Sequence, residues 1–192
     1  MRKGFQSEIF DSQQVFRKLL DAMARPGQIQ TLQTELDCPA DIHPASGAIL
    51  LTLLDGDTLF WSGHENASEE SQWLRFHTGV PFTRSRGQAL FALVTDCDSF
   101  DDPNAFCQGT VEAPYLSATI IVQTLGIDNS GRMQLTGPGV QNGVFLGVKG
   151  IKEEVWQNRA IAQQAYPMGV DLIFVHENRF VSLPRTTRLE IF

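Results

Sequence analysis

The sequence is poor in cysteine and lacks any long apolar run. Its three cysteines, Cys38, Cys97 and Cys107, form no Cys-x-x-Cys pair, so neither a disulfide framework nor a zinc ligand set is indicated. The longest strongly apolar stretches, around Ala48–Leu54 and Ala118–Val122, are too short to span a bilayer. The N-terminus also lacks the apolar segment of a signal peptide. We therefore expect a cytoplasmic protein with reduced thiols and no membrane partner.

The sequence also has fewer basic than acidic residues. The 192 residues include 15 basic and 22 acidic side chains, giving a formal net charge of -7. Nonspecific binding to nucleic acid requires a basic surface, so this class of protein is excluded. Lysine is scarce, however, and 11 of the 15 basic residues are arginine. Because guanidinium groups fork onto carboxylates and phosphates, this bias suits either surface ion pairs or a local anion site.

Common catalytic signatures are absent too. Gly137-Pro138-Gly139 has neither the Lys-Ser/Thr of a phosphate-binding loop nor the spacing of a dinucleotide-binding fingerprint. The turn that contains Ser46 lacks the Gly-x-Ser-x-Gly pattern of a nucleophile. No two histidines are spaced like a metal-binding pair. The histidines are His43, His64, His77 and His176. Composition and spacing alone thus indicate an α/β domain, at most with an anion site.

The chain length and the even spread of turn signals predict one domain over residues 1–192. Helices are predicted from hydrophobic periodicity at Asp11–Ala24, Ala45–Leu54, Ser68–His77 and Lys152–Ala165. Strands are predicted at Gln28–Leu32, Thr58–Trp61, Ala89–Val94, Ala118–Gln123, Met133–Thr136, Val170–Val175, Phe180–Leu183 and Leu189–Phe192. A hairpin-like turn is expected at Asp128-Asn129-Ser130-Gly131. The mixture of elements predicts an α/β fold with a mixed sheet flanked by helices.

Three short segments are candidates for anion binding. Arg25 precedes Pro26-Gly27 at a predicted helix end, where an arginine also compensates the helix dipole. Gly137 and Gly139 flank a proline after a strand, in a turn that either binds an anion through backbone N–H groups or simply reverses the chain.

The third segment is Pro184-Arg185-Thr186-Thr187-Arg188. It offers forked donors and hydroxyls to a phosphate, or else protects an edge strand from aggregation. In an extended chain Arg185 and Arg188 would point to opposite faces, so the two guanidiniums converge only if the chain turns. We take Arg25, Gly137, Gly139, Arg185, Thr186 and Thr187 as the candidate ligand-binding residues.

Read in order, several segments resemble one family, the PhnH subunits of the bacterial carbon–phosphorus lyase system. Small departures from its pattern at Ala24, Val80 and Tyr166 remove no charged group. The segments that carry the resemblance are Phe16–Gly27, Leu53–Asp55, Thr58–Trp61, Trp73–Gly79, Gly109-Thr110, Pro114–Thr119, Gly137–Gly139, Tyr166–Asp171 and Leu183–Thr187.

The resemblance implies a fold similar to that of pyridoxal-phosphate-dependent transferases, without the cofactor. Such enzymes need a Schiff-base lysine in a pocket. Here only Lys149 falls in a predicted loop, whereas the other three lysines lie at the terminus or on helical faces. No cofactor and no metal are therefore expected.

The resemblance also implies partners and a reaction. Family members form homodimers and join a core assembly with PhnG, PhnI and PhnJ. With PhnG, PhnI and the ATPase-like PhnL they are needed to move the ribose triphosphate of ATP onto methylphosphonate, with adenine leaving. The resemblance supplies no catalytic residues on this subunit, so a structural or substrate-positioning role is expected. The alternative is a stand-alone transferase that depends on pyridoxal phosphate or a nucleotide. Candidate interface anchors are Phe76, Phe100 and Trp156.

Overall fold

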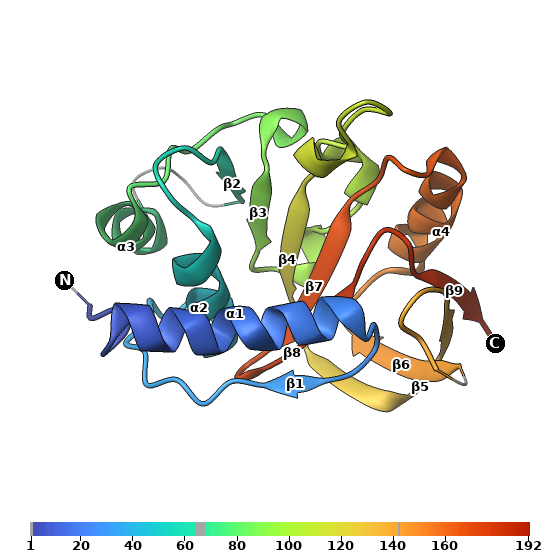
Figure 1. The fold of residues 1–192 in the computed structure, drawn as a ribbon, viewed down its shortest axis with the longest axis horizontal. Helices are drawn as coiled ribbons and strands as arrows, with labels where there is room; N and C mark the ends of the chain where they lie inside the picture. Colours follow the sequence, from blue (N-terminus) through green and yellow to red (C-terminus); the bar gives the residue numbers. More distant parts are fainter. Residues whose placement is uncertain (1, 64–67, 142) are drawn as a thin grey trace.

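The computed structural model describes residues 2–63, 68–141 and 143–192, so His64 lies outside the described part. The helices are α1 (Glu8–Ala24), α2 (Pro44–Leu53), α3 (Glu69–Thr78) and α4 (Glu153–Ala162) (Figure 1). The strands are β1 (Gln30–Thr31), β2 (Phe60–Ser62), β3 (Phe91–Val94), β4 (Thr119–Gln123), β5 (Gly126–Thr136), β6 (Val144–Lys149), β7 (Asp171–His176), β8 (Arg179–Leu183) and β9 (Arg188–Ile191).

The described strands form two sheets. The larger sheet has the order β1-β8-β7-β4-β3-β2, in which β2, β3, β4 and β7 run parallel to one another. Strands β8 and β1 extend it in the antiparallel sense. The smaller sheet, β6-β5-β9, is antiparallel. The predicted α/β class with a mixed sheet flanked by helices is confirmed.

The larger sheet separates two apolar clusters. Because successive strand residues point to opposite faces, Ile121 of β4 packs with α1, α2 and α3, whereas its neighbours Ile120 and Val122 face the other side. On that second face, α4 and the smaller sheet supply the packing partners. Figure 1 shows α1 passing across the sheet, with α4 and the smaller sheet beyond its C-terminal end.

Local sequence signals explain several element ends. Ser68 caps α3, its hydroxyl oxygen accepting a hydrogen bond from the backbone N–H of Ser71 at 3.1 Å. Gly79 ends the same helix with φ at 72°, a conformation that glycine adopts without strain. Helix α4 follows Lys152 and passes into a 3-10 turn at Gln163–Ala165, close to the predicted end.

The predicted turn at 128–131 is wrong. Strand β5 runs through these residues, and its register against β6 shifts between Asp128 and Met133. The Asp128 carboxylate accepts the backbone N–H of Ser130 at 2.9 Å, a turn-like bond inside a bulge. A Cβ at Gly131 would lie 2.1 Å from the carbonyl oxygen of Leu146. The absence of a side chain at Gly131 therefore allows β6 to approach the backbone of β5 closely. Strand β6 itself was not predicted from the sequence.

Helix α1 buries only part of its apolar side: Val15 and Leu19 are buried, whereas Phe16 and Leu20 remain 45% and 53% exposed. One expectation about a lysine is corrected. Lys149 is the last residue of β6 and does not lie in a loop. Within the described residues, no helix is long and apolar enough to cross a membrane.

Candidate functional site

A cavity of about 620 Å³ lies where β8 leads into β9. Strand β8 ends at Leu183, and the backbone N–H of Thr187 donates to the carbonyl oxygen of Pro184 at 2.9 Å, closing a turn before β9 begins at Arg188. Because the chain turns here, Arg185 and Arg188 both line the cavity. The lining residues are Thr136, Gly137, Pro138, Gln163, Tyr166, Arg185, Thr186 and Arg188.

Arg185 is held by a carboxylate behind the cavity. Its Nη2 lies 2.7 Å from Oδ2 of Asp171, and its backbone N–H donates to Oδ1 of Asp171 at 2.7 Å. Its Nη1 donates to the carbonyl oxygen of Pro114. Both side chains of the ion pair are largely shielded from water, at 19% and 11% exposure. The position of the Arg185 guanidinium is therefore fixed, and its charge is largely balanced.

A second arginine supports the turn from beneath. Arg159 of α4 is buried, and its guanidinium donates to the carbonyl oxygens of Leu183 and Pro184 at 3.2 and 2.7 Å. It makes no ion pair with a described carboxylate, although Asp171 is near enough to favour its charge. Burial lowers the pKa of Arg159 to about 10, so the group remains a cation at neutral pH.

The threonines of the turn differ in position. Thr186 lines the cavity, whereas Thr187 is 1% exposed and its hydroxyl has no hydrogen-bond partner among the described residues. Gln163 donates to the carbonyl oxygen of Thr187 through Nε2 and ties the turn to the end of α4. A Cβ at Gly137 would lie 2.9 Å from the carbonyl oxygen of Thr186, so the Gly137 turn packs directly on this segment.

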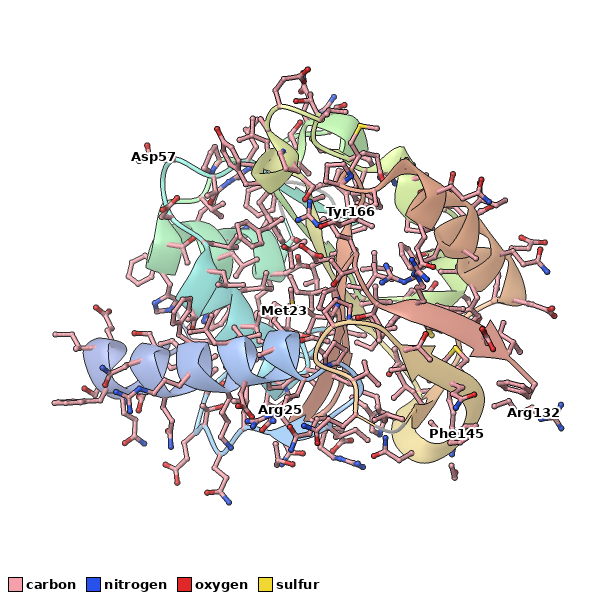
Figure 2. All side chains as sticks on the ribbon, turned by 45° about the vertical axis from the view of Figure 1, so that its right-hand side comes forward. Met23, Arg25, Asp57, Arg132, Phe145 and Tyr166 are labelled. Carbon is pink, nitrogen blue, oxygen red and sulfur yellow. The ribbon has the colours of Figure 1, made fainter. Side chains whose placement is uncertain are left out.

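Arg25 and Gly139 belong to a different cavity, of about 600 Å³. Arg25 is 57% exposed and forms an ion pair with Asp21 of the same helix. Figure 2 shows Arg25 at the end of α1, apart from Tyr166 of the first cavity. Of the predicted residues, Gly137, Arg185 and Thr186 thus share one cavity, Arg25 and Gly139 share another, and Thr187 is buried.

Sequence reasoning missed Arg188 and Arg159 as site residues. Arg188 was left out because the alternation of side chains along a strand placed it on the opposite face from Arg185. The turn that brings both arginines to one cavity depends on tertiary contacts, which the sequence does not show. Arg159 gave no signal, because a single arginine in a predicted helix is usually exposed.

The described histidines, His43, His77 and His176, do not line the first cavity. Nδ1 of His43 accepts the backbone N–H of Glu177 at 3.1 Å, and its ring centroid lies 5.9 Å from that of His176. Burial lowers the pKa of His43, as does the neighbouring His176, while Glu177 acts in the opposite direction.

A pH effect on stability follows from His43. Its folded-state pKa is below the unfolded value of about 6.5, so the unfolded chain binds the proton more tightly and stability falls as the pH drops below that value. In urea unfolding between pH 7.5 and 5, we expect His43→Gln to lose less stability than the unsubstituted chain. Parallel pH profiles for the two proteins would contradict this.

Comparison with known proteins decides the family. The family model described as bacterial phosphonate metabolism protein (PhnH) matches residues 3–190. The chain belongs to the PhnH family. It is 36% identical to the alpha-D-ribose 1-methylphosphonate 5-triphosphate synthase subunit PhnH of Rhizobium meliloti (strain 1021), over 97% of this chain and 94% of that protein. It is also 35% identical to the putative C-P lyase subunit protein HtxG of Stutzerimonas stutzeri, over 43% of each.

Membership in the PhnH family confirms the resemblance on which the sequence analysis relied. Two of the segments that carried it, Gly137–Gly139 and Leu183–Thr187, meet at the first cavity. A third, Phe16–Gly27, reaches the same Gly137–Gly139 turn from its other side, because Gly139 packs on Ala24. These three PhnH-like segments therefore meet in space although they lie far apart in the sequence.

Proposed function

We propose that this chain is a subunit of a phosphonate-activating enzyme of the carbon–phosphorus lyase system. In this proposal it is needed, with PhnG, PhnI and PhnL, to transfer the ribose triphosphate of ATP to methylphosphonate. The observation that carries the proposal is the 36% identity to a protein named as a subunit of ribose 1-methylphosphonate 5-triphosphate synthase, covering nearly all of both chains.

Within such an enzyme we assign the chain a structural or substrate-positioning role. The first cavity offers guanidinium, hydroxyl and amide groups, which bind and orient an anion. The candidate ligand-binding residues remain Arg25, Gly137, Gly139, Arg185, Thr186 and Thr187, of which the first five are divided between two cavities and Thr187 is buried.

The surface of α1 supports a role in an assembly. Ile9, Phe16 and Leu20 are 79%, 45% and 53% exposed, and their spacing places them on one side of the helix, beside the buried stripe. The half-buried Met23 follows on the same side of the helix and lines a cavity that also includes Tyr166; Figure 2 shows Met23 near the C-terminal end of α1. Exposed apolar surface of this kind is typical of a protein–protein contact, and we propose the core subunits PhnG, PhnI and PhnJ as its partners.

Co-purification tests the proposed assembly. When a tagged form of this chain is co-expressed with PhnG, PhnI and PhnJ, we expect all four proteins to elute together in constant proportions during size-exclusion chromatography. The same chain expressed alone is expected to run as a homodimer. If the chain elutes free while all partners are present, the proposed role in the complex is wrong.

A charge placed on the exposed stripe should weaken this assembly. Leu20→Glu buries a carboxylate in an apolar contact, and we expect at least a tenfold loss of co-purified partners with little change in the melting temperature. Gln14→Glu is the matched control, because Gln14 is exposed on another side of α1. Equal recovery of partners with both variants would exclude this surface as the contact.

The alternative is a stand-alone transferase that uses pyridoxal phosphate or a nucleotide. We propose that the fold is similar to that of the pyridoxal-phosphate-dependent transferases without retention of the cofactor. In the part of the chain that the structure describes, no lysine lines either cavity, and Lys149 is 68% exposed with its Nζ 3.6 Å from Asp128. Incubation with pyridoxal phosphate should therefore produce no absorption band of an internal aldimine, and such a band would favour the alternative.

A further inference from the structure

Arg188 presents an unbalanced charge to the first cavity. Its side chain is exposed, lines the cavity, and forms no ion pair with any described carboxylate. Among the described residues, no aspartate or glutamate lines the cavity, and Glu190, two residues along the same face of β9, does not line it. Arg185, by contrast, already has Asp171 as its partner. Arg188 is thus the guanidinium that is available to a ligand.

We propose that this cavity binds a phosphate or phosphonate group, with Arg188 as its direct ligand and Arg185 as a positioning residue. The inference deepens the proposed function, because it names the ligand class and the binding residue of the same cavity. A guanidinium on a short strand beside a turn can fork onto two oxygens of one tetrahedral anion.

The positive charge of the buried Arg159, behind the cavity wall, also favours an anion beside Arg188. Arg159, Arg185 and Arg188 bring three guanidiniums to the turn, and among the described carboxylates only Asp171 forms an ion pair with one of them. Arg159 is buried and contacts the carbonyl oxygens of Leu183 and Pro184, so its positive field is poorly screened by water. A dianion beside Arg188 would balance this excess.

Neutral donors complete the binding groups. Thr136, Thr186 and Tyr166, which carry hydroxyl groups, line the cavity together with Gln163. Gln163 is held through its bond to Thr187, and Tyr166 lies at the rim with 64% of its surface exposed. Hydroxyls and amides donate to phosphate oxygens without adding a competing charge.

A neighbouring cavity of about 360 Å³ provides space for an organic substituent. It shares Tyr166, Arg185 and Thr186 with the first cavity. Its other walls include Met23, Tyr115 and Asp171; Tyr115 is 78% exposed, and the Asp171 carboxylate is already paired with Arg185. Because charged and apolar walls adjoin, the site fits an ester or phosphonate with an apolar group better than inorganic phosphate.

Titration of the purified full chain tests this site. The probes are inorganic phosphate, methylphosphonate, phenylphosphonate and phenyl phosphate, followed by calorimetry and by the NMR signal of the Arg188 Nε–H. We expect saturable binding at one site, with both phenyl compounds tighter than inorganic phosphate. The tighter of the two phenyl compounds then identifies a phosphonate or a phosphate ester as the ligand. Absence of saturable binding, or tighter binding of inorganic phosphate, would overturn the inference.

Arg188→Gln separates the proposed contact from general charge effects. We expect it to weaken phenylphosphonate binding at least tenfold, since a bond to a charged partner is lost. Arg132→Gln is the matched control: it makes the same change of charge on an exposed residue of the smaller sheet, far from Tyr166 in Figure 2. Equal weakening by both variants would overturn the assignment. If the unsubstituted chain binds no phenylphosphonate but still co-purifies with its partners, this site is refuted and the proposed assembly stands.

Discussion

Gly139→Ala is expected to destabilise the fold by about 3 kcal/mol. Gly139 adopts φ of +79°, which an alanine reaches only with strain, and its Cβ would lie 2.0 Å from the carbonyl oxygen of Ala24. The obstacle is backbone at the end of α1, so no side chain can rotate away. In thermal unfolding we expect the melting temperature to fall by roughly 6–12 °C for a chain of this size.

Gly56→Ala is the control for this prediction. A Cβ at Gly56 meets no atom within 4 Å, so the expected change is within about 0.5 kcal/mol. If Gly139→Ala were as stable as Gly56→Ala, the Gly137–Gly139 turn would not pack on the end of α1. The arrangement in which this turn separates the two cavities at the end of α1 would then be contradicted.

Asp171→Asn should also cost about 3 kcal/mol, because it removes the carboxylate from a shielded ion pair and leaves the cation in place. Arg185 would keep a hydrogen-bond acceptor but lose its balancing charge. The buried Arg159 would lose the nearby negative charge that favours its ionised form. Urea unfolding at neutral pH gives the free-energy difference directly.

Asp101→Asn is the matched surface change. Asp101 is 64% exposed and pairs with Arg86 at 2.9 Å, and an exposed pair of this kind contributes at most about 1 kcal/mol. Equal losses in the two variants would mean that the Asp171–Arg185 pair is as weak as a surface pair. Arg185 would then not be held in position by Asp171.

The sequence predicted the regular elements well where one face of an element is apolar and its ends carry turn residues. Helix α3 begins after Ser68 and ends at Gly79 because a hydroxyl cap and a left-handed glycine are local signals. Strand β4 is recognisable because its β-branched run is buried on both faces. Such features depend little on distant parts of the chain.

The prediction was wrong where distant contacts reverse a local signal. Gly131 belongs to a bulge because β6 approaches its backbone, a contact that no local pattern contains. Of the aromatic residues considered as interface anchors, Phe100 and Trp156 are buried, and only Phe76 is exposed. The sequence also did not reveal the exposed apolar stripe on α1, because helical spacing cannot distinguish burial within the fold from burial against a partner.

The candidate site shows the same division. The glycine and arginine motifs indicated an anion site and named Arg185, but they could not show that Asp171 occupies its guanidinium. The grouping of Gly137 with Thr186, and of Gly139 with Ala24, depends on backbone approach between segments far apart in sequence. Only the fold identifies Arg188 as the charge that remains available in the cavity.

The reaction itself tests the proposed function most directly. PhnG, PhnI and PhnL are incubated with ATP and methylphosphonate, with and without this chain, and phosphorus NMR follows the formation of ribose 1-methylphosphonate 5-triphosphate while chromatography follows adenine. We predict that both products form only when this chain is present, and that the chain alone forms neither. Equal product formation without the chain would contradict its role as a required subunit, and product formation by the chain alone would make it a stand-alone transferase.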